Sequence, residues 1–117
     1  MFKVKMAGIY KIEHVSGYYY IGMSVDIFSR WSSHYTSIKM KSHSSTALME
    51  LWNSTNDTDW SFTILEHISL TDYKKETNLK GKSLENSFRK LLLDKEKEHM
   101  KLYSINFSLN KSNKHFS

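Results

Sequence analysis

Cysteine and proline are both absent from this chain of 117 residues. Without cysteine the protein can form neither disulfides nor a thiolate zinc site, so zinc-finger DNA-reading modules are excluded. The same absence fits a reducing compartment, and we expect a cytoplasmic location. Without proline nothing marks a linker, and the length suits one modest core, so residues 1–117 are predicted to form a single domain.

Long apolar runs are absent as well. No stretch of the sequence is apolar over the length needed to span a bilayer, and the opening residues MFKVKMAG contain no hydrophobic signal region. We therefore expect neither export nor membrane anchoring. The hydrophobic fraction of 39% and the aromatic fraction of 14% favour a folded chain over a disordered one.

Positive charge is in excess. The 17 Lys and Arg residues outnumber the 12 Asp and Glu residues, which gives a formal net charge of +5. This balance favours a polyanionic partner such as nucleic acid. A basic surface that serves only solubility would explain the charge equally well, so the choice between the two depends on motifs.

Two short runs near the N-terminus predict a β-hairpin. Residues 6–13 alternate weakly between apolar and polar, residues 18–22 are rich in tyrosine, and His14–Gly17 between them is typical of a turn. With a turn of five residues, Tyr10 would lie directly opposite Tyr20, and both rings would share one face of the sheet.

Two helices are predicted after the hairpin. Asp26 can cap the first helix, and residues 46–53 predict the second, with Ser44 or Ser45 as its cap. The apolar residues of the first helix recur at helical spacing: Ile27, Trp31, Tyr35 and Ile38.

The remaining chain predicts a strand, a loop and a long helix. Alternation from Trp60 to Ile64 predicts a third strand, and the polar, basic residues 71–82 predict a mobile loop with at most one helical turn. The long helix begins at Ser83. After Tyr103 the tail forms either a short terminal strand or an extended segment packed on the sheet. The predicted order is β-β-α-α-β-α, which belongs to the α/β (α+β) class.

Four side chains in the first third of the chain suit phosphate chemistry. Arg30 can bind phosphate oxygens in a bidentate manner, and His34, one helical turn later, can act as a general base or phosphate ligand. Tyr10 and Tyr20 are weak acids that could orient or deprotonate a water molecule. Taken singly, a surface arginine, a surface histidine and two packed aromatic rings would explain the same residues.

Glu85 is the predicted metal ligand. Mg²⁺ keeps most of its water molecules and often uses only one or two carboxylates, so a single glutamate is sufficient. Glu96 and Glu98 lie on the same predicted helix, but the apolar seam around Leu84 and Phe88 places Glu85 nearest the core. The alternative is a surface ion pair of Glu85 with the arginine four residues later, which would contribute little. Helix position alone favours this alternative.

The tripeptides Gly8-Ile9-Tyr10 and Tyr20-Ile21-Gly22, followed by Arg30 and His34, resemble the opening of the GIY-YIG nuclease domain. The segments HSSTALMELW and WSFTILEHI are similar to phage homing-endonuclease domains of that family. The resemblance implies a small three-stranded antiparallel sheet flanked by helices. It also implies a DNA endonuclease that depends on Mg²⁺ or Mn²⁺ and has one active site per chain.

The resemblance implies roles for individual residues as well. Arg30 aligns with the catalytic arginine, and Glu85 with the metal-binding glutamate. Supporting roles fall to Gly22, which would allow close backbone approach, to His43 and to Asn110, for which Asn106 is a possible substitute. Some family members have a lysine shortly after the second tripeptide, whereas Met23-Ser24-Val25 occupies that place here.

Partners follow from the same resemblance. Four lysines before and at the start of the long helix are predicted to contact the DNA backbone: Lys74, Lys75, Lys80 and Lys82. We expect no appended reading module, and therefore a nicking enzyme, a homodimer, or an enzyme that borrows specificity from a partner protein. The alternatives are an inactive nucleic-acid-binding or regulatory module on this fold, and a structural subunit that binds protein through residues 94–101.

Overall fold

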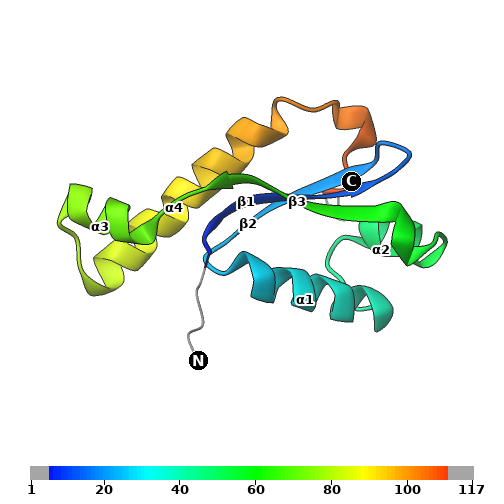
Figure 1. The fold of residues 1–117 in the computed structure, drawn as a ribbon, viewed down its shortest axis with the longest axis horizontal. Coiled ribbons are helices and arrows are strands. Elements are labelled where there is room, and N and C mark those ends of the chain that lie inside the picture. The colour runs from blue at the N-terminus through cyan, green and yellow to red at the C-terminus, as the bar shows by residue number, and fades with distance from the viewer. Residues whose placement is uncertain (1–5, 111–117) are drawn as a thin grey trace, which may run out of the picture.

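The computed structural model describes residues 6–110 and shows a small antiparallel sheet with helices on both faces (Figure 1). The three strands lie in the order β2-β1-β3. In chain order the strands are β1 (Gly8–His14), β2 (Tyr19–Ser24) and β3 (Trp60–His67). The helices are α1 (Ile27–Lys39), α2 (Thr46–Asn53), α3 (Leu70–Thr77) and α4 (Gly81–Met100), with short 3₁₀ turns η1 (Asp57–Asp59) and η2 (Ile105–Phe107). The predicted fold class and element order are confirmed.

The sheet separates two apolar cores. On one face Tyr10 and Ile12 pack with residues of α1 and α2, among them Ile38 and Trp52. On the other face the neighbouring residue Ile9 packs near the C-terminal half of α4. The alternation of side chains along β1 therefore decides which helix each residue meets. No helix within residues 6–110 is long and apolar enough to cross a membrane.

The hairpin register differs from the prediction by two residues. Tyr10 pairs with Gly22, and Tyr20 pairs with Ile12, so the two tyrosines are not directly opposite. The turn between the strands has four residues, 15–18, and is closed by the His14 N–H, which donates to the Tyr18 carbonyl at 2.9 Å. An offset of two keeps side chains on the same face, so the predicted shared face of Tyr10 and Tyr20 is confirmed.

The predicted N-terminal caps of the first two helices are confirmed. The Asp26 carboxylate accepts from the Ser29 N–H at the start of α1, and Ser45 is the residue that caps α2. In the predicted stripe of α1, Ile27 and Ile38 are fully buried, whereas Tyr35 is exposed.

The segment predicted as a loop over residues 71–82 contains the two-turn helix α3, so that prediction is wrong. Its N-terminus is capped by Ser69, whose hydroxyl accepts from the Asp72 N–H at 3.1 Å, and it ends at Asn78 in a left-handed conformation. The ring of Tyr73 packs against Phe88 of α4, with ring centroids 5.5 Å apart. One aromatic anchor thus holds an otherwise polar helix, and α4 begins two residues before the predicted Ser83.

The C-terminal segment lies beside β2 in an extended form. Ser108 forms a single parallel bridge with Tyr19, and the Leu109 N–H donates to the Tyr19 carbonyl at 2.6 Å. Of the two predicted forms of the tail, the structure shows the extended segment, preceded by the 3₁₀ turn η2.

Candidate active site

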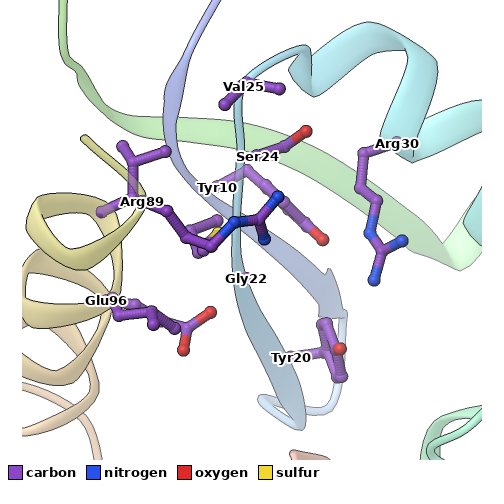
Figure 2. Close-up of a pocket in the computed structure, with 11 residues that line it drawn as sticks. Tyr10, Tyr20, Gly22, Ser24, Val25, Arg30, Arg89 and Glu96 are labelled. Atoms are coloured by element: carbon purple, nitrogen blue, oxygen red, sulfur yellow. The ribbon is translucent and has the colours of Figure 1, made fainter. Parts of the chain in front are cut away.

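A hollow of about 350 Å³ opens between β2, α1 and α4 (Figure 2). Its floor is formed by the two tyrosines and the glycine of the hairpin motif. Arg30 of α1 lies on one side, while Arg89 and Glu96 of α4 lie on the other, and all three side chains extend toward the space above β2 (Figure 2). The structure therefore brings together Tyr10, Tyr20, Gly22 and Arg30, as the sequence predicted.

Gly22 makes room for the Tyr10 ring. A Cβ atom added at Gly22 would lie 2.5 Å from Cζ of Tyr10, a separation that real side chains essentially never show. The two residues are register partners, so the phenol lies directly across the neighbouring strand. In this structure the group that approaches Gly22 closely is the protein's own Tyr10, and the supporting role of Gly22 in the site stays a prediction.

His34 is buried beneath the pocket and is fixed at both ring nitrogens. Its Nε2 lies 2.5 Å from the Tyr10 hydroxyl, and its Nδ1 lies 2.5 Å from Nε2 of His43. The Ser45 N–H in turn donates to Nδ1 of His43 at 2.8 Å. The ring of Tyr20 packs edge-on against both histidine rings. The alternative that His34 lies on a helix surface is excluded, since only 3% of the residue is exposed.

Burial dominates the electrostatics of these rings. It raises the pKa of Tyr10 well above the ordinary value and also raises the pKa of Tyr20, while the Arg30 guanidinium lowers both. Burial lowers the pKa of His34 to about 3, with further lowering by His43 and Arg30. It lowers the pKa of His43 as well. These shifts favour the neutral forms of the two phenols and the two imidazoles near neutral pH.

The carboxylate in the pocket is Glu96, not Glu85. Glu85 is exposed and lines a neighbouring hollow with Lys82 and Leu70, whereas Glu96 is half-buried, so the prediction that Glu85 lies nearest the core is wrong. The two glutamates are eleven residues apart on one helix, which separates them by roughly 16 Å along its axis. The alternative of a surface pair between Glu85 and Arg89 is not observed either, since no ion pair within residues 6–110 includes either side chain.

Glu96 is half-buried, and no cation within residues 6–110 forms an ion pair with it. Burial raises the pKa of its carboxyl above the ordinary value, although Lys97, the Met23 backbone and Arg30 each act to lower it. A carboxylate held in this state is poised to gain from a cation that enters the pocket.

Comparison with known protein families identifies the family of this chain. The sequence model of the GIY-YIG catalytic domain matches residues 6–98, a span that contains every residue of the pocket. The chain belongs to the GIY-YIG family. It is a nuclease domain, and the predicted family is confirmed.

Solved structures agree with this GIY-YIG assignment. The catalytic domain of the homing endonuclease I-TevI shares the fold at a TM-score of 0.68 and 23% identity, covering 92% of this chain and 99% of that one. A glutamate-to-alanine mutant of the catalytic domain of the intron endonuclease I-TevI matches at a TM-score of 0.52 and 28% identity, covering 62% and 84% of the two chains. No curated protein matches the chain.

Asn110 lies outside the pocket and forms hydrogen bonds with the backbone of the GIY-YIG sheet. Its side-chain Oδ1 accepts from the Ile21 N–H at 2.9 Å, and its Nδ2 donates to the Ile21 carbonyl at 2.5 Å. Ile21 belongs to β2, an edge strand, so the amide group occupies the place of one further strand residue. The predicted supporting role of Asn110 is consistent with this contact, whereas Asn106 is exposed on η2.

The four predicted DNA-binding lysines are exposed at one end of the molecule. Lys74 and Lys75 lie on α3, Lys80 precedes α4, and Lys82 lies in its first turn (Figure 1). Lys82 lines the hollow that adjoins the pocket, since both hollows share Val25 and Arg89.

Sequence reasoning set Glu96 aside in favour of Glu85 and did not assign Arg89 to the GIY-YIG pocket, although both residues line it. A signal for Glu96 was present, because Phe88, Leu92, Glu96 and Met100 follow one another at intervals of four. Phe88 and Leu92 are buried, and Met100 packs against the core, so the acid interrupts a buried seam. Arg89 gave no comparable signal, because an exposed arginine on a charged helix is ordinary.

Proposed function

We propose that this GIY-YIG domain is a DNA endonuclease that depends on a divalent metal and has one active centre per chain. The observation that supports this best is the placement of a guanidinium and a carboxylate on opposite sides of one pocket, with two phenols between them (Figure 2). Hydrolysis of a phosphodiester needs an activated water molecule and stabilisation of the negative charge that develops on phosphorus and the leaving oxygen. This set of side chains meets those needs.

Arg30 would bind the scissile phosphate. Its guanidinium keeps its positive charge at any physiological pH and can hold two phosphate oxygens at once. Arg89 reaches the same pocket from α4 and would hold a second oxygen or the adjacent phosphate. It thereby supplies a positive charge next to Met23-Ser24-Val25, the place where some family members have a lysine.

Glu96 would hold the metal ion. Within residues 6–110 no group of three His, Cys, Asp or Glu side chains is placed to form a complete metal cage. A lone carboxylate facing a pocket that accepts phosphate suits Mg²⁺ or Mn²⁺, which retain water molecules and take further oxygen ligands from the substrate. When bound, such an ion would polarise the phosphate and stabilise the leaving oxygen.

The buried group of Tyr10, Tyr20 and His34 would orient and activate the attacking water. The phenols line the pocket while His34 supports them from below. Lys74, Lys75, Lys80 and Lys82 would contact the duplex backbone, which gives affinity without sequence preference. Specificity would then come from a second copy of the domain or from a partner protein.

A plasmid-nicking assay tests the proposal. Supercoiled DNA should be relaxed or linearised in the presence of Mg²⁺ or Mn²⁺ and should remain intact in excess chelator. Arg30→Ala should abolish cleavage while the circular dichroism spectrum and melting temperature stay close to those of the wild type. Cleavage that continues in chelator would contradict metal dependence. DNA binding without cleavage under every metal condition would instead identify an inactive binding module.

A further inference from the structure

Four groups form a continuous hydrogen-bonded chain beneath the pocket. It begins at the backbone N–H of Ser45, passes through the rings of His43 and His34, and ends at the Tyr10 hydroxyl. All four residues are buried. Such a chain can transmit a proton only in a direction that its donors and acceptors allow.

The first link fixes the protonation of His43. A backbone N–H can donate but cannot accept, so Nδ1 of His43 must present a lone pair to Ser45. The donor is held in place, because the Ser45 hydroxyl accepts from the Leu48 N–H at 3.1 Å and donates to the Leu109 carbonyl at 2.5 Å. A neutral imidazole with an unprotonated Nδ1 has its proton on Nε2, so His43 can only donate to His34.

The second and third links follow in the same direction. Nδ1 of His34 accepts from His43, so the proton of a neutral His34 lies on Nε2, which faces the Tyr10 oxygen. The reverse order, in which Tyr10 donates to His34 and His34 donates to His43, would leave His43 without a proton on either nitrogen. An imidazolate buried in this position is not a stable species near neutral pH.

We propose that this chain runs only from Ser45 to Tyr10, so that His34 is a fixed donor and the phenol proton of Tyr10 faces the pocket. His34 is then a positioning residue and cannot be the general base, because neither nitrogen has a free lone pair. Tyr10 releases its phenol proton to solvent water in the open pocket when substrate binds, and the resulting phenolate then takes one proton from the attacking water. The catalytic part of this inference rests on the proposed function, whereas the direction of the chain does not.

The direction explains how a phenol in so buried a place could ionise. When the Tyr10 proton leaves, the phenolate retains the N–H of His34 as a donor, and a hydrogen bond to a charged oxygen is stronger than one to a neutral oxygen. Arg30 favours the same ionised form. A phosphate or metal ion in the pocket would complete the change, so ionisation is coupled to substrate binding.

Long-range ¹H–¹⁵N correlation spectra of the wild-type histidine side chains test the direction without any substrate. Both His34 and His43 should have a protonated Nε2 and an unprotonated Nδ1 near neutral pH. A His34 ring protonated at Nδ1, or at both nitrogens, would overturn the proposal. The spectra do not depend on activity, so a domain that cuts no DNA but shows these tautomers would refute the proposed function and leave the direction supported.

A matched pair of variants tests the consequence. His43→Gln keeps a donor that can serve His34, whereas His43→Glu has only acceptors and forces His34 to donate from Nδ1 to residue 43. We expect His34 to keep its tautomer in the glutamine variant and to gain a proton at Nδ1 in the glutamate variant. Cleavage should fall by on the order of 10²-fold or more for glutamate relative to glutamine. The same His34 tautomer in both variants would overturn the proposal.

Discussion

The Tyr10 phenol crosses the hairpin and lies against the Cα atom of Gly22, its register partner on the neighbouring strand. This is the register pair that joins the two tripeptides of the family motif. Because the hydroxyl of Tyr10 also meets His34, the glycine determines where the buried histidine chain ends. The second glycine of the motif is therefore required by the position of the first tyrosine.

Gly22→Ala tests this relationship. The added methyl group must displace the Tyr10 ring, so we expect a stability loss of about 1–3 kcal/mol from overpacking and a loss of cleavage on the order of 10²-fold from the misplaced hydroxyl. Urea unfolding and plasmid nicking measure the two effects. Gly17→Ala is the control, because Gly17 has a φ of +101° in the turn but a Cβ there meets only Phe107 at 3.8 Å. That variant should lose stability and keep its activity per folded molecule.

Glu96→Gln tests the metal ligand. The amide has the same shape but lacks the charge, so Mn²⁺ binding measured by calorimetry or electron paramagnetic resonance should weaken at least tenfold, a loss of about 1.4 kcal/mol. Plasmid cleavage should fall with it. The matched control is Glu85→Gln on the same helix, which should bind Mn²⁺ and cleave DNA as the wild type does. Loss of metal binding in the Glu85 variant alone would reverse the assignment.

Acid should destabilise the domain through His34. Its pKa is lowered to about 3 by burial, by His43 and by Arg30, whereas in the unfolded chain it is about 6.5. Between these values the unfolded chain binds more protons than the folded one, so stability is complete above about pH 6.5 and is lost as the pH falls toward 3, by up to about 1.4 kcal/mol per pH unit.

His43 contributes in the same direction, since its pKa is also lowered. Urea unfolding measured at several pH values below neutrality gives the slope. His34→Asn removes one titrating group and should flatten that slope relative to the wild type, while ordinary carboxylate titration stays common to both proteins. Equal slopes for the two proteins would show that His34 is not buried in its neutral form.

Asn110→Ala should open the edge of the sheet. The variant loses both hydrogen bonds to Ile21 and leaves a partly buried N–H and carbonyl without their partner, which we expect to cost about 1–3 kcal/mol in the free energy of unfolding. Amide hydrogen exchange at Ile21 should accelerate. Asn106→Ala is the control, because Asn106 is exposed, and it should change neither quantity. An unaffected Ile21 amide in the Asn110 variant would show that the contact does not protect the strand.

The sequence was sufficient to predict which side chains share a face of a strand or helix. It was not sufficient to predict where along the element each side chain aligns with its neighbours. Alternation within β1 and β2 correctly placed Tyr10 and Tyr20 on one face, whereas their pairing depended on the length of the turn, which a pattern of residue types does not determine. The same limit applies to α4. Glu85 and Glu96 lie on nearly the same side of that helix. The position of the helix along its axis relative to the sheet determines which of them shares a pocket with Arg30.

The helix α3 shows a second limit. Its residues are almost all polar or charged, so local composition is typical of a loop, and its helical state depends on the packing of Tyr73 against Phe88. The place of Arg89 in the pocket was hidden for a similar reason. Its side chain reaches the pocket only because α4 crosses β2 beside the second tripeptide, a tertiary arrangement that i to i+4 spacing cannot reveal.

Arg89→Ala tests whether the pocket uses two positive charges. If Arg30 binds the scissile phosphate and Arg89 an adjacent oxygen, removal of Arg89 should weaken DNA binding and reduce the slope of log affinity against log salt by about 1. Arg89→Lys should restore the salt slope but not the full cleavage rate, because a flexible ammonium group does not reproduce the fixed planar donor geometry of a guanidinium.

The control for charge alone is Lys90→Ala, which removes the neighbouring exposed cation of α4. Binding in 50–200 mM salt can be measured by fluorescence anisotropy with a labelled duplex, and single-turnover cleavage separates binding from chemistry. We expect the Lys90 variant to cleave at the wild-type rate once DNA is saturating, and the Arg89→Ala variant to remain slow. Equal rates at saturation would limit Arg89 to general attraction of DNA and leave Arg30 as the phosphate ligand of the pocket.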